Sequence, residues 1–148
     1  MTLPRWIDLP PVWLAGFAAL TWAGGKAGLP GGSPLIALAG AGLVLVGLAL
    51  MAAAAFEMMR RRTTIIPHQE PAALVTTGIF ALSRNPIYLG DAMILAGLAL
   101  RWCWPALALV PVFMWVIERR FIRSEELRLL DKFPTDFVSY RQRTKRWL

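Results

Sequence analysis

The sequence has few of the side chains that metal sites and hydrolases need. It contains one cysteine, Cys103, one histidine, His68, and four serines in 148 residues. A single cysteine excludes an internal disulfide and a cysteine-rich metal site, and a single histidine argues against a zinc site built from histidines. A Ser/His/Asp arrangement is not credible either, because His68 lies in a polar, turn-rich segment. We therefore expect no metal.

Charge is missing from long stretches of the chain. The composition is 57% hydrophobic, with a mean hydropathy of +0.52 and a formal net charge of +7. The Lys and Arg residues lie beside apolar runs, whereas a nucleic-acid-binding domain carries them over a soluble fold. We expect these charges to meet membrane lipids and no nucleic acid. The length allows one domain, so residues 1–148 are expected to form a single all-α integral membrane domain.

Four apolar segments predict four transmembrane helices, at about 11–29, 35–59, 86–101 and 104–120. The second is the clearest, since its only charge is the terminal Glu57 and about 20 residues suffice to cross a bilayer. Its small residues, including Ala37 and Ala41, favour close helix packing. The apolar region 86–117 is too long for one span, because ~30 residues rise about 45 Å. We predict a helical hairpin that turns near Arg101–Pro105; one span plus a surface helix is the alternative.

Clusters of basic residues predict the orientation of these spans. Arg60, Arg61 and Arg62 follow the second span, and a charged segment, 121–148, follows the fourth. Because cytoplasmic loops carry an excess of Lys and Arg, we place the N- and C-termini in the cytoplasm. Segment 121–148 is expected to contain a short cytoplasmic helix. Arg119, Arg120, Arg123 and the closing basic run 141–146 are expected to meet lipid headgroups.

The segment 60–85 is the most informative part of the chain. Asn85 suits the N-cap of the third span, and Pro86 suits its first turn. Capping does not account for Arg84, nor for Tyr88 and Gly90 one turn inside the helix. Polar groups held at a membrane surface are costly, so this loop is where we expect chemistry. Asp91, early in the same helix, is interpreted as structural because the helix dipole favours a negative charge there.

Two adjacent carboxylates, Glu125 and Glu126, follow the fourth span. Sequence alone favours a solvated amphipathic helix in which Glu125 pairs with Arg128 at i,i+3. The alternative is that a carboxylate near the membrane surface holds a cationic ligand.

Together these segments resemble the isoprenylcysteine carboxyl methyltransferase family, which also includes phospholipid N-methyltransferases. The resemblance covers about residues 63–148 and rests on Gly78-Ile79-Phe80, Ser83-Arg84-Asn85-Pro86-Ile87-Tyr88-Leu89-Gly90, Glu125-Glu126 and the closing 140–147. It implies S-adenosylmethionine bound between loop 60–85 and segment 121–148, with S-adenosylhomocysteine as product. It also implies a lipophilic acceptor that enters from the bilayer, and a bacterial-type member in the inner membrane.

The resemblance implies roles for individual residues. Arg84, Asn85 and Glu125 are the expected catalytic residues. The expected cofactor-binding residues are His68, Gly78, Phe80, Arg84, Asn85, Pro86, Tyr88, Gly90, Glu125, Glu126 and Tyr140. The acidic pair would hold the cofactor's amino group or ribose hydroxyls, and Arg84 its carboxylate or an anionic acceptor.

The chain departs from the family pattern at two places. Asn85 replaces a histidine, and an amide cannot titrate as a general base. Residues 133–137 (Phe-Pro-Thr-Asp-Phe) replace a Phe-Gly-Glu-x-Tyr segment.

The chemistry of the acceptor stays open at this point. A prenylcysteine carboxylate, an amine headgroup, a phenol and a small thiol are all compatible with the sequence, and the oligomeric state is open too. A small four-span transporter and a non-catalytic membrane subunit are the functional alternatives. A transporter requires an ionisable residue deep within a span, and the first two spans contain none at their centres.

Overall fold

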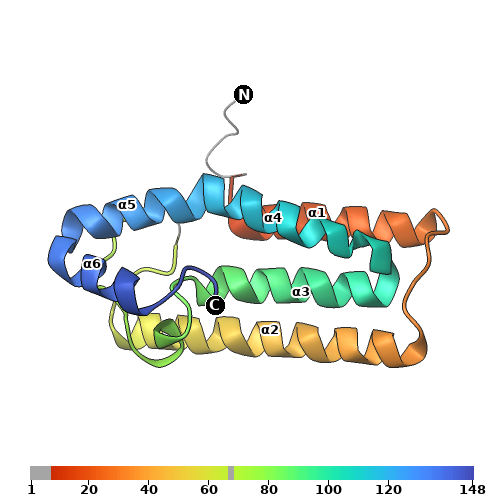
Figure 1. Cartoon of the computed structure of the whole chain (residues 1–148), viewed down its shortest axis with the longest axis horizontal. Coiled ribbons are helices and arrows are strands. Elements are labelled where there is room, and N and C mark those ends of the chain that lie inside the picture. The colour runs from red at the N-terminus through yellow and green to blue at the C-terminus, as the bar shows by residue number, and fades with distance from the viewer. Residues whose placement is uncertain (1–7, 67–68) are drawn as a thin grey trace.

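A computed structural model describes residues 8–66 and 69–148, and this part of the chain is helical without strands. The all-α prediction is confirmed. The helices are α1 (Pro10–Lys26), α2 (Pro34–Arg60), η1 (Gly78–Ala81), α3 (Pro86–Trp102), η2 (Trp104–Ala108), α4 (Leu109–Ile117), η3 (Glu118–Ile122), α5 (Arg123–Lys132) and α6 (Pro134–Arg143) (Figure 1). Among the described residues, α2 is the one helix long and apolar enough to cross a membrane.

The long helices lie side by side, with α3 between α2 on one side and α1 and α4 on the other (Figure 1). The chain reverses direction after α3, where Cys103 leaves the helical conformation (φ −162°, ψ 87°). At this turn the Trp104 backbone N–H donates to the Pro30 carbonyl oxygen at 3.1 Å, which ties the α1–α2 connection to the hairpin. The reversal therefore falls within the predicted turn.

Glycines bring α2 and α3 into direct backbone contact. A Cβ added to Gly97 would lie 2.4 Å from the Gly40 carbonyl oxygen, and one added to Gly47 would lie 2.7 Å from the Gly90 carbonyl oxygen. The two glycines on each helix are seven residues apart, so both pairs lie on one face. Small residues at such positions permit close approach of apolar helices. The tightest contacts use these glycines, while Ala37 and Ala41 are only half-buried.

The last long helix continues past residue 120, where the fourth span was expected to end. α4, η3 and α5 follow one another without a gap as far as Lys132, because no Gly or Pro interrupts residues 112–133. η3 is a π-helical turn, a feature that often lies at functional sites. Pro134 then begins α6, which folds back beneath α5 (Figure 1). Segment 121–148 thus contributes two helices instead of one short one.

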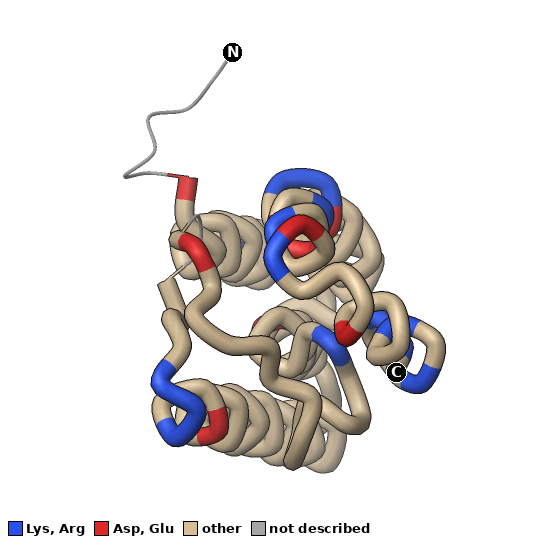
Figure 2. The backbone as a smooth tube through the Cα atoms, turned by 90° about the vertical axis from the view of Figure 1, so that its left-hand side faces the viewer, with Lys and Arg blue, Asp and Glu red and all other residues tan. Residues whose placement is uncertain are grey.

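Large apolar side chains remain exposed along the bundle, and most charges collect at one end. The side chains of Leu35, Leu38, Leu45 and Phe56 on α2 are exposed. Only 11% of the most apolar 18-residue stretch of this helix is buried inside the protein. Seen from the end that carries α5 and α6, Lys, Arg, Asp and Glu lie on the near segments (Figure 2). The bundle therefore has an apolar flank and a charged end.

Candidate functional site

A cavity of about 340 Å³ lies at the charged end of the bundle. It is bounded by α2, segments 63–66 and 69–75, the start of α3, α5 and α6, and the two prolines that open α1. Its walls are mostly apolar, with a few charged side chains. A concave, mainly apolar space of this size with a few polar groups is typical of a small-molecule site.

Most of the expected site residues come together in this cavity. Those that line it are Phe80, Arg84, Asn85, Pro86, Tyr88, Glu125, Glu126 and Tyr140. Gly78 and Gly90 do not line it. Gly78 has φ +60° at the turn before η1, close to the Glu57 carboxylate, and Gly90 packs against Gly47 and Met51 of α2. His68 lies outside the described residues.

A hydrogen bond joins α3 to α5 inside the site. The buried Tyr88 hydroxyl donates to Glu125 Oε1 at 2.7 Å. Glu125 stands three residues after the π-helical turn, in the first turn of α5. This contact turns the Glu125 carboxylate toward α3, so it belongs to the cavity and not to a fully solvated helix face.

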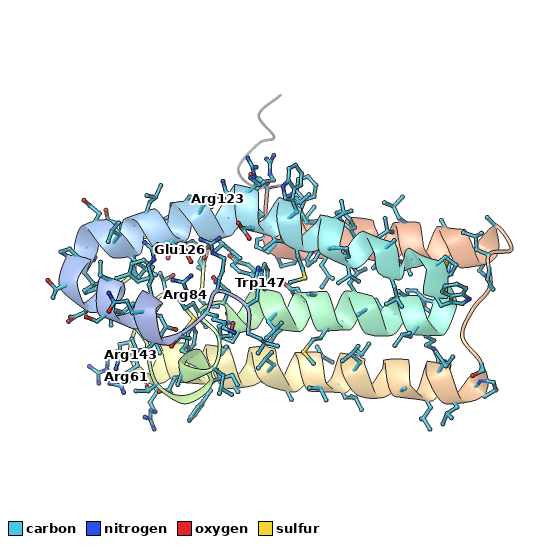
Figure 3. The ribbon with its side chains drawn as sticks, viewed as in Figure 1. Arg61, Arg84, Arg123, Glu126, Arg143 and Trp147 are labelled. Atoms are coloured by element: carbon cyan, nitrogen blue, oxygen red, sulfur yellow. The ribbon has the colours of Figure 1, made fainter. Side chains whose placement is uncertain are left out.

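Glu126 is the centre of an ion-pair network (Figure 3). Arg84 Nη2 lies 3.2 Å from Glu126 Oε1, and Arg146 Nη2 donates to Glu126 Oε2 at 2.6 Å. Arg146 Nη1 also donates to Glu118 Oε1 at 2.9 Å. Burial lowers the pKa of Arg84, although the charge of Glu126 opposes this, and hydrogen bonds to Glu126 raise the pKa of Arg146. Both guanidiniums stay charged, because arginine titrates far above neutral pH.

The segment after α6 crosses the loop between α2 and α3. The Arg84 backbone N–H donates to the Lys145 carbonyl oxygen at 3.0 Å, and Asn85 Nδ2 donates to the Arg146 carbonyl oxygen at 3.0 Å. The Tyr140 hydroxyl donates to the Phe80 carbonyl oxygen at 2.6 Å, and burial raises the pKa of Tyr140, so it stays a donor. These bonds fix the loop that carries Arg84 against residues 140–146.

Two interpretations from the sequence need correction here. Asn85 occupies the N-cap position of α3, but its side-chain oxygen accepts no capping hydrogen bond; its Nδ2 donates instead to the Arg146 carbonyl oxygen after α6. Several arginines assigned to lipid headgroups pair within the protein instead. Arg146 pairs with Glu126 and Glu118, Arg120 with Asp8 at 2.9 Å, and Arg123 with Glu118 at 3.3 Å.

Two guanidinium nitrogens in the cavity walls have no protein partner. Among the described residues, Arg84 Nε and Arg128 Nη2 are buried and have no acceptor for their hydrogens. Unsatisfied buried donors are uncommon in proteins and usually indicate a missing partner. Guanidinium groups bind carboxylates and phosphates strongly. Arg84 and Arg128 both line the cavity, so their guanidinium groups can bind an anionic group beside the carboxylates of Glu125 and Glu126.

Sequence reasoning missed Glu57, Arg128 and Arg146. Glu57 is buried near the end of α2, where its Oε1 accepts a hydrogen bond from the Thr77 hydroxyl at 2.6 Å. The signal for Glu57 was present, since it is the one carboxylate in the apolar run 35–59. Arg128 was read only as a partner of Glu125. The contacts of Arg146 with Glu118 and Glu126 carry no local signal, because the partners are 28 and 20 residues away.

A comparison with protein families found one match. The family model described as phospholipid methyltransferase matches residues 35–134, from the start of α2 to the start of α6. This range includes the loop with Arg84 and both Glu125 and Glu126. Searches of curated proteins and of solved structures found no match.

Proposed function

The chain belongs to the phospholipid methyltransferase family, and we propose that it transfers a methyl group from S-adenosylmethionine to a lipophilic acceptor at the cytoplasmic face of a membrane. Family membership supports methyl transfer to a lipid. The observation that supports the cofactor is the cavity itself, which two arginines, Arg84 and Arg128, and two carboxylates, Glu125 and Glu126, line together.

The residues that line the cavity suit the chemical groups of S-adenosylmethionine. The guanidinium groups of Arg84 and Arg128 can donate to its carboxylate, and Glu125 and Glu126 can accept from its amino group or ribose hydroxyls. Phe80 and Phe137 offer apolar surface to an adenine ring. When bound, the cofactor supplies a methyl group on a sulfonium, which an acceptor displaces in line. The protein's task is then to position the acceptor and to exclude water.

The surface of the bundle supports a membrane location with four embedded helices. α2 exposes large apolar side chains along its length, and tryptophans accompany Lys26 and Arg101 at the end opposite the cavity. Tryptophan and basic residues mark the two faces of a bilayer. α1 and α3 have 17 residues each, about 25 Å, which nearly spans the ~30 Å core. The arginine-rich end with the cavity and both termini faces the cytoplasm in this arrangement, in a bacterial inner membrane.

Apolar residues of the cavity lining suit a lipid chain. Pro10 and Pro11 of α1, Met51 of α2 and the exposed Ile66 line the cavity, and none of them carries a polar side chain. We expect an acceptor that enters from the bilayer to contact these residues.

Labelled methyl transfer in washed membranes tests the enzyme and its membrane location together. Membranes from cells that produce the chain are washed with alkaline carbonate and incubated with S-adenosylmethionine labelled in the methyl group. We expect label in the lipid extract above that of membranes without the chain. Glu125→Gln and Glu126→Gln should each lower the rate at subsaturating cofactor by about tenfold or more, since hydrogen bonds to charged groups contribute about 1.5–3 kcal/mol.

Asp131→Asn is the matched control, because Asp131 is exposed on α5 and does not line the cavity. Release of the chain by the carbonate wash would contradict the membrane location. Unlabelled lipid from membranes that retain folded protein would favour a transporter or a non-catalytic subunit.

A further inference from the structure

Asp91 is the charged residue that lies deepest within the helical bundle. The other charged residues of α1 to α4, Lys26, Glu57, Arg60 and Arg101, stand within the last four residues of their helices. Asp91 is the sixth residue of α3, is only 2% exposed and lines the cavity. Removing a carboxylate from water is costly unless something compensates its charge.

The described residues do not supply that compensation. Over residues 8–66 and 69–148, no hydrogen bond or ion pair reaches the Asp91 carboxylate. Tyr88 lies one turn earlier on the same face, but its hydroxyl donates a hydrogen bond to Glu125 instead. The helix dipole acts mainly within the first turn, which ends before Asp91. As a purely structural residue, Asp91 would therefore have no partner for its carboxylate among the described residues.

Asp91 lines the same cavity as the apolar residues Pro10, Pro11 and Met51. Arg84 and the carboxylates of Glu125 and Glu126, proposed above to hold the cofactor, come from the loop before α3 and from α5. Asp91 thus lies farther into the bundle than the loop that carries Arg84, in the same cavity.

We propose, on the basis of the methyltransferase function above, that Asp91 contacts the methyl acceptor and takes the proton that the acceptor loses. The acceptor is then an amine: its ammonium form pairs with the carboxylate on entry. Transfer of one N–H proton to an Asp91 oxygen leaves two neutral groups, which apolar surroundings favour over two charges. The freed nitrogen lone pair forms the new N–C bond to the methyl carbon, while the C–S bond breaks and its electron pair stays on sulfur.

The Asp91 carboxylate also disfavours the binding of anionic acceptors. A lipophilic carboxylate or thiolate in the cavity would face a like charge at short range in a site of low dielectric constant, which is unfavourable. Asp91 therefore determines specificity as well as proton transfer.

Two probes with the same alkyl chain test this assignment. Dodecylamine and dodecanoate are titrated into phosphatidylcholine nanodiscs that contain the protein, with empty nanodiscs subtracted. We expect wild type to bind dodecylamine at least about tenfold more tightly than dodecanoate, since hydrogen bonds to charged groups contribute about 1.5–3 kcal/mol. Asp91→Asn, which is nearly isosteric, should lose the preference. Asp91→Glu should keep it, as should the exposed control Asp131→Asn.

Two further readouts separate this proposal from the one on which it rests. Asp91→Asn should bind S-adenosylhomocysteine as wild type does, while its rate of methyl transfer to dodecylamine falls by about 100-fold or more, the usual contribution of a general base. If wild type binds S-adenosylhomocysteine but Asp91→Asn retains the amine preference and the rate, the role of Asp91 is refuted alone. If wild type does not bind S-adenosylhomocysteine, both proposals fail.

Discussion

Arg84→Ala is expected to weaken the binding of S-adenosylhomocysteine by about 30- to 150-fold, which corresponds to about 2–3 kcal/mol. The variant removes both the Nε donor that lacks a protein partner and the positive charge 3.2 Å from Glu126. Folding should survive, because Glu126 keeps its bonds to Arg146 and the backbone N–H of residue 84 keeps its bond to the Lys145 carbonyl. Titration calorimetry in detergent measures the affinity.

Arg84→Lys and Arg143→Ala are the controls for this result. Lysine keeps the charge but lacks the fork of donors, so Arg84→Lys should bind with intermediate affinity. Arg143 is exposed on α6 and donates only to the Ser139 carbonyl one turn earlier, so Arg143→Ala should match wild type. A folded Arg84→Ala protein that binds with wild-type affinity would exclude Arg84 from the cofactor site.

Gly97→Val is expected to cause a large loss of stability, because it separates α2 from α3. The added Cβ would lie 2.4 Å from the Gly40 carbonyl oxygen and 2.7 Å from Val44 Cγ2. The Gly40 carbonyl oxygen cannot move away unless α2 and α3 separate. Overpacking of this kind lowers the free energy of unfolding by about 1–3 kcal/mol or more. For a chain of this size the unfolding temperature should fall by about 5 °C or more.

Cys103 offers a direct readout of this unfolding. It is the only cysteine and is 1% exposed, so a thiol-reactive fluorophore reports its exposure on heating. Gly42→Val is the matched control on α2, since a Cβ at Gly42 meets nothing within 4 Å. That variant should unfold at or slightly above the wild-type temperature, because valine has a higher helix propensity than glycine. Equal loss of stability in both variants would show that the glycine contact is not what holds α2 against α3.

Local patterns in the sequence were sufficient to predict the first three long helices and the turn after the third. The apolar runs, Pro86 at the start of α3 and the break at residues 101–105 all act through neighbouring residues. The end of the fourth helix was less predictable, because residues 118–133 change from apolar to charged without a residue that breaks a helix. Composition changes there, but helical structure does not.

The candidate site was predictable only in part, because its contacts join distant segments. The resemblance brought Arg84, Tyr88, Glu125 and Glu126 together, and all four line the cavity. The bond from Asn85 to the carbonyl of residue 146 joins positions 61 apart, so a capping role was the natural local reading. From the sequence, Asp91 resembles any carboxylate early in a helix. Its burial, and the lack of a partner among the described residues, are visible only in the structure.

The most direct measurement is the titration of the purified wild-type protein with S-adenosylhomocysteine in detergent. We predict one site per chain with micromolar affinity, unchanged in Asp131→Asn and strongly weakened in Arg84→Ala. Such a result would establish the cavity between the α2–α3 loop and α5–α6 as the cofactor site. A folded wild-type protein that shows no binding of S-adenosylhomocysteine or S-adenosylmethionine would contradict the proposed enzyme.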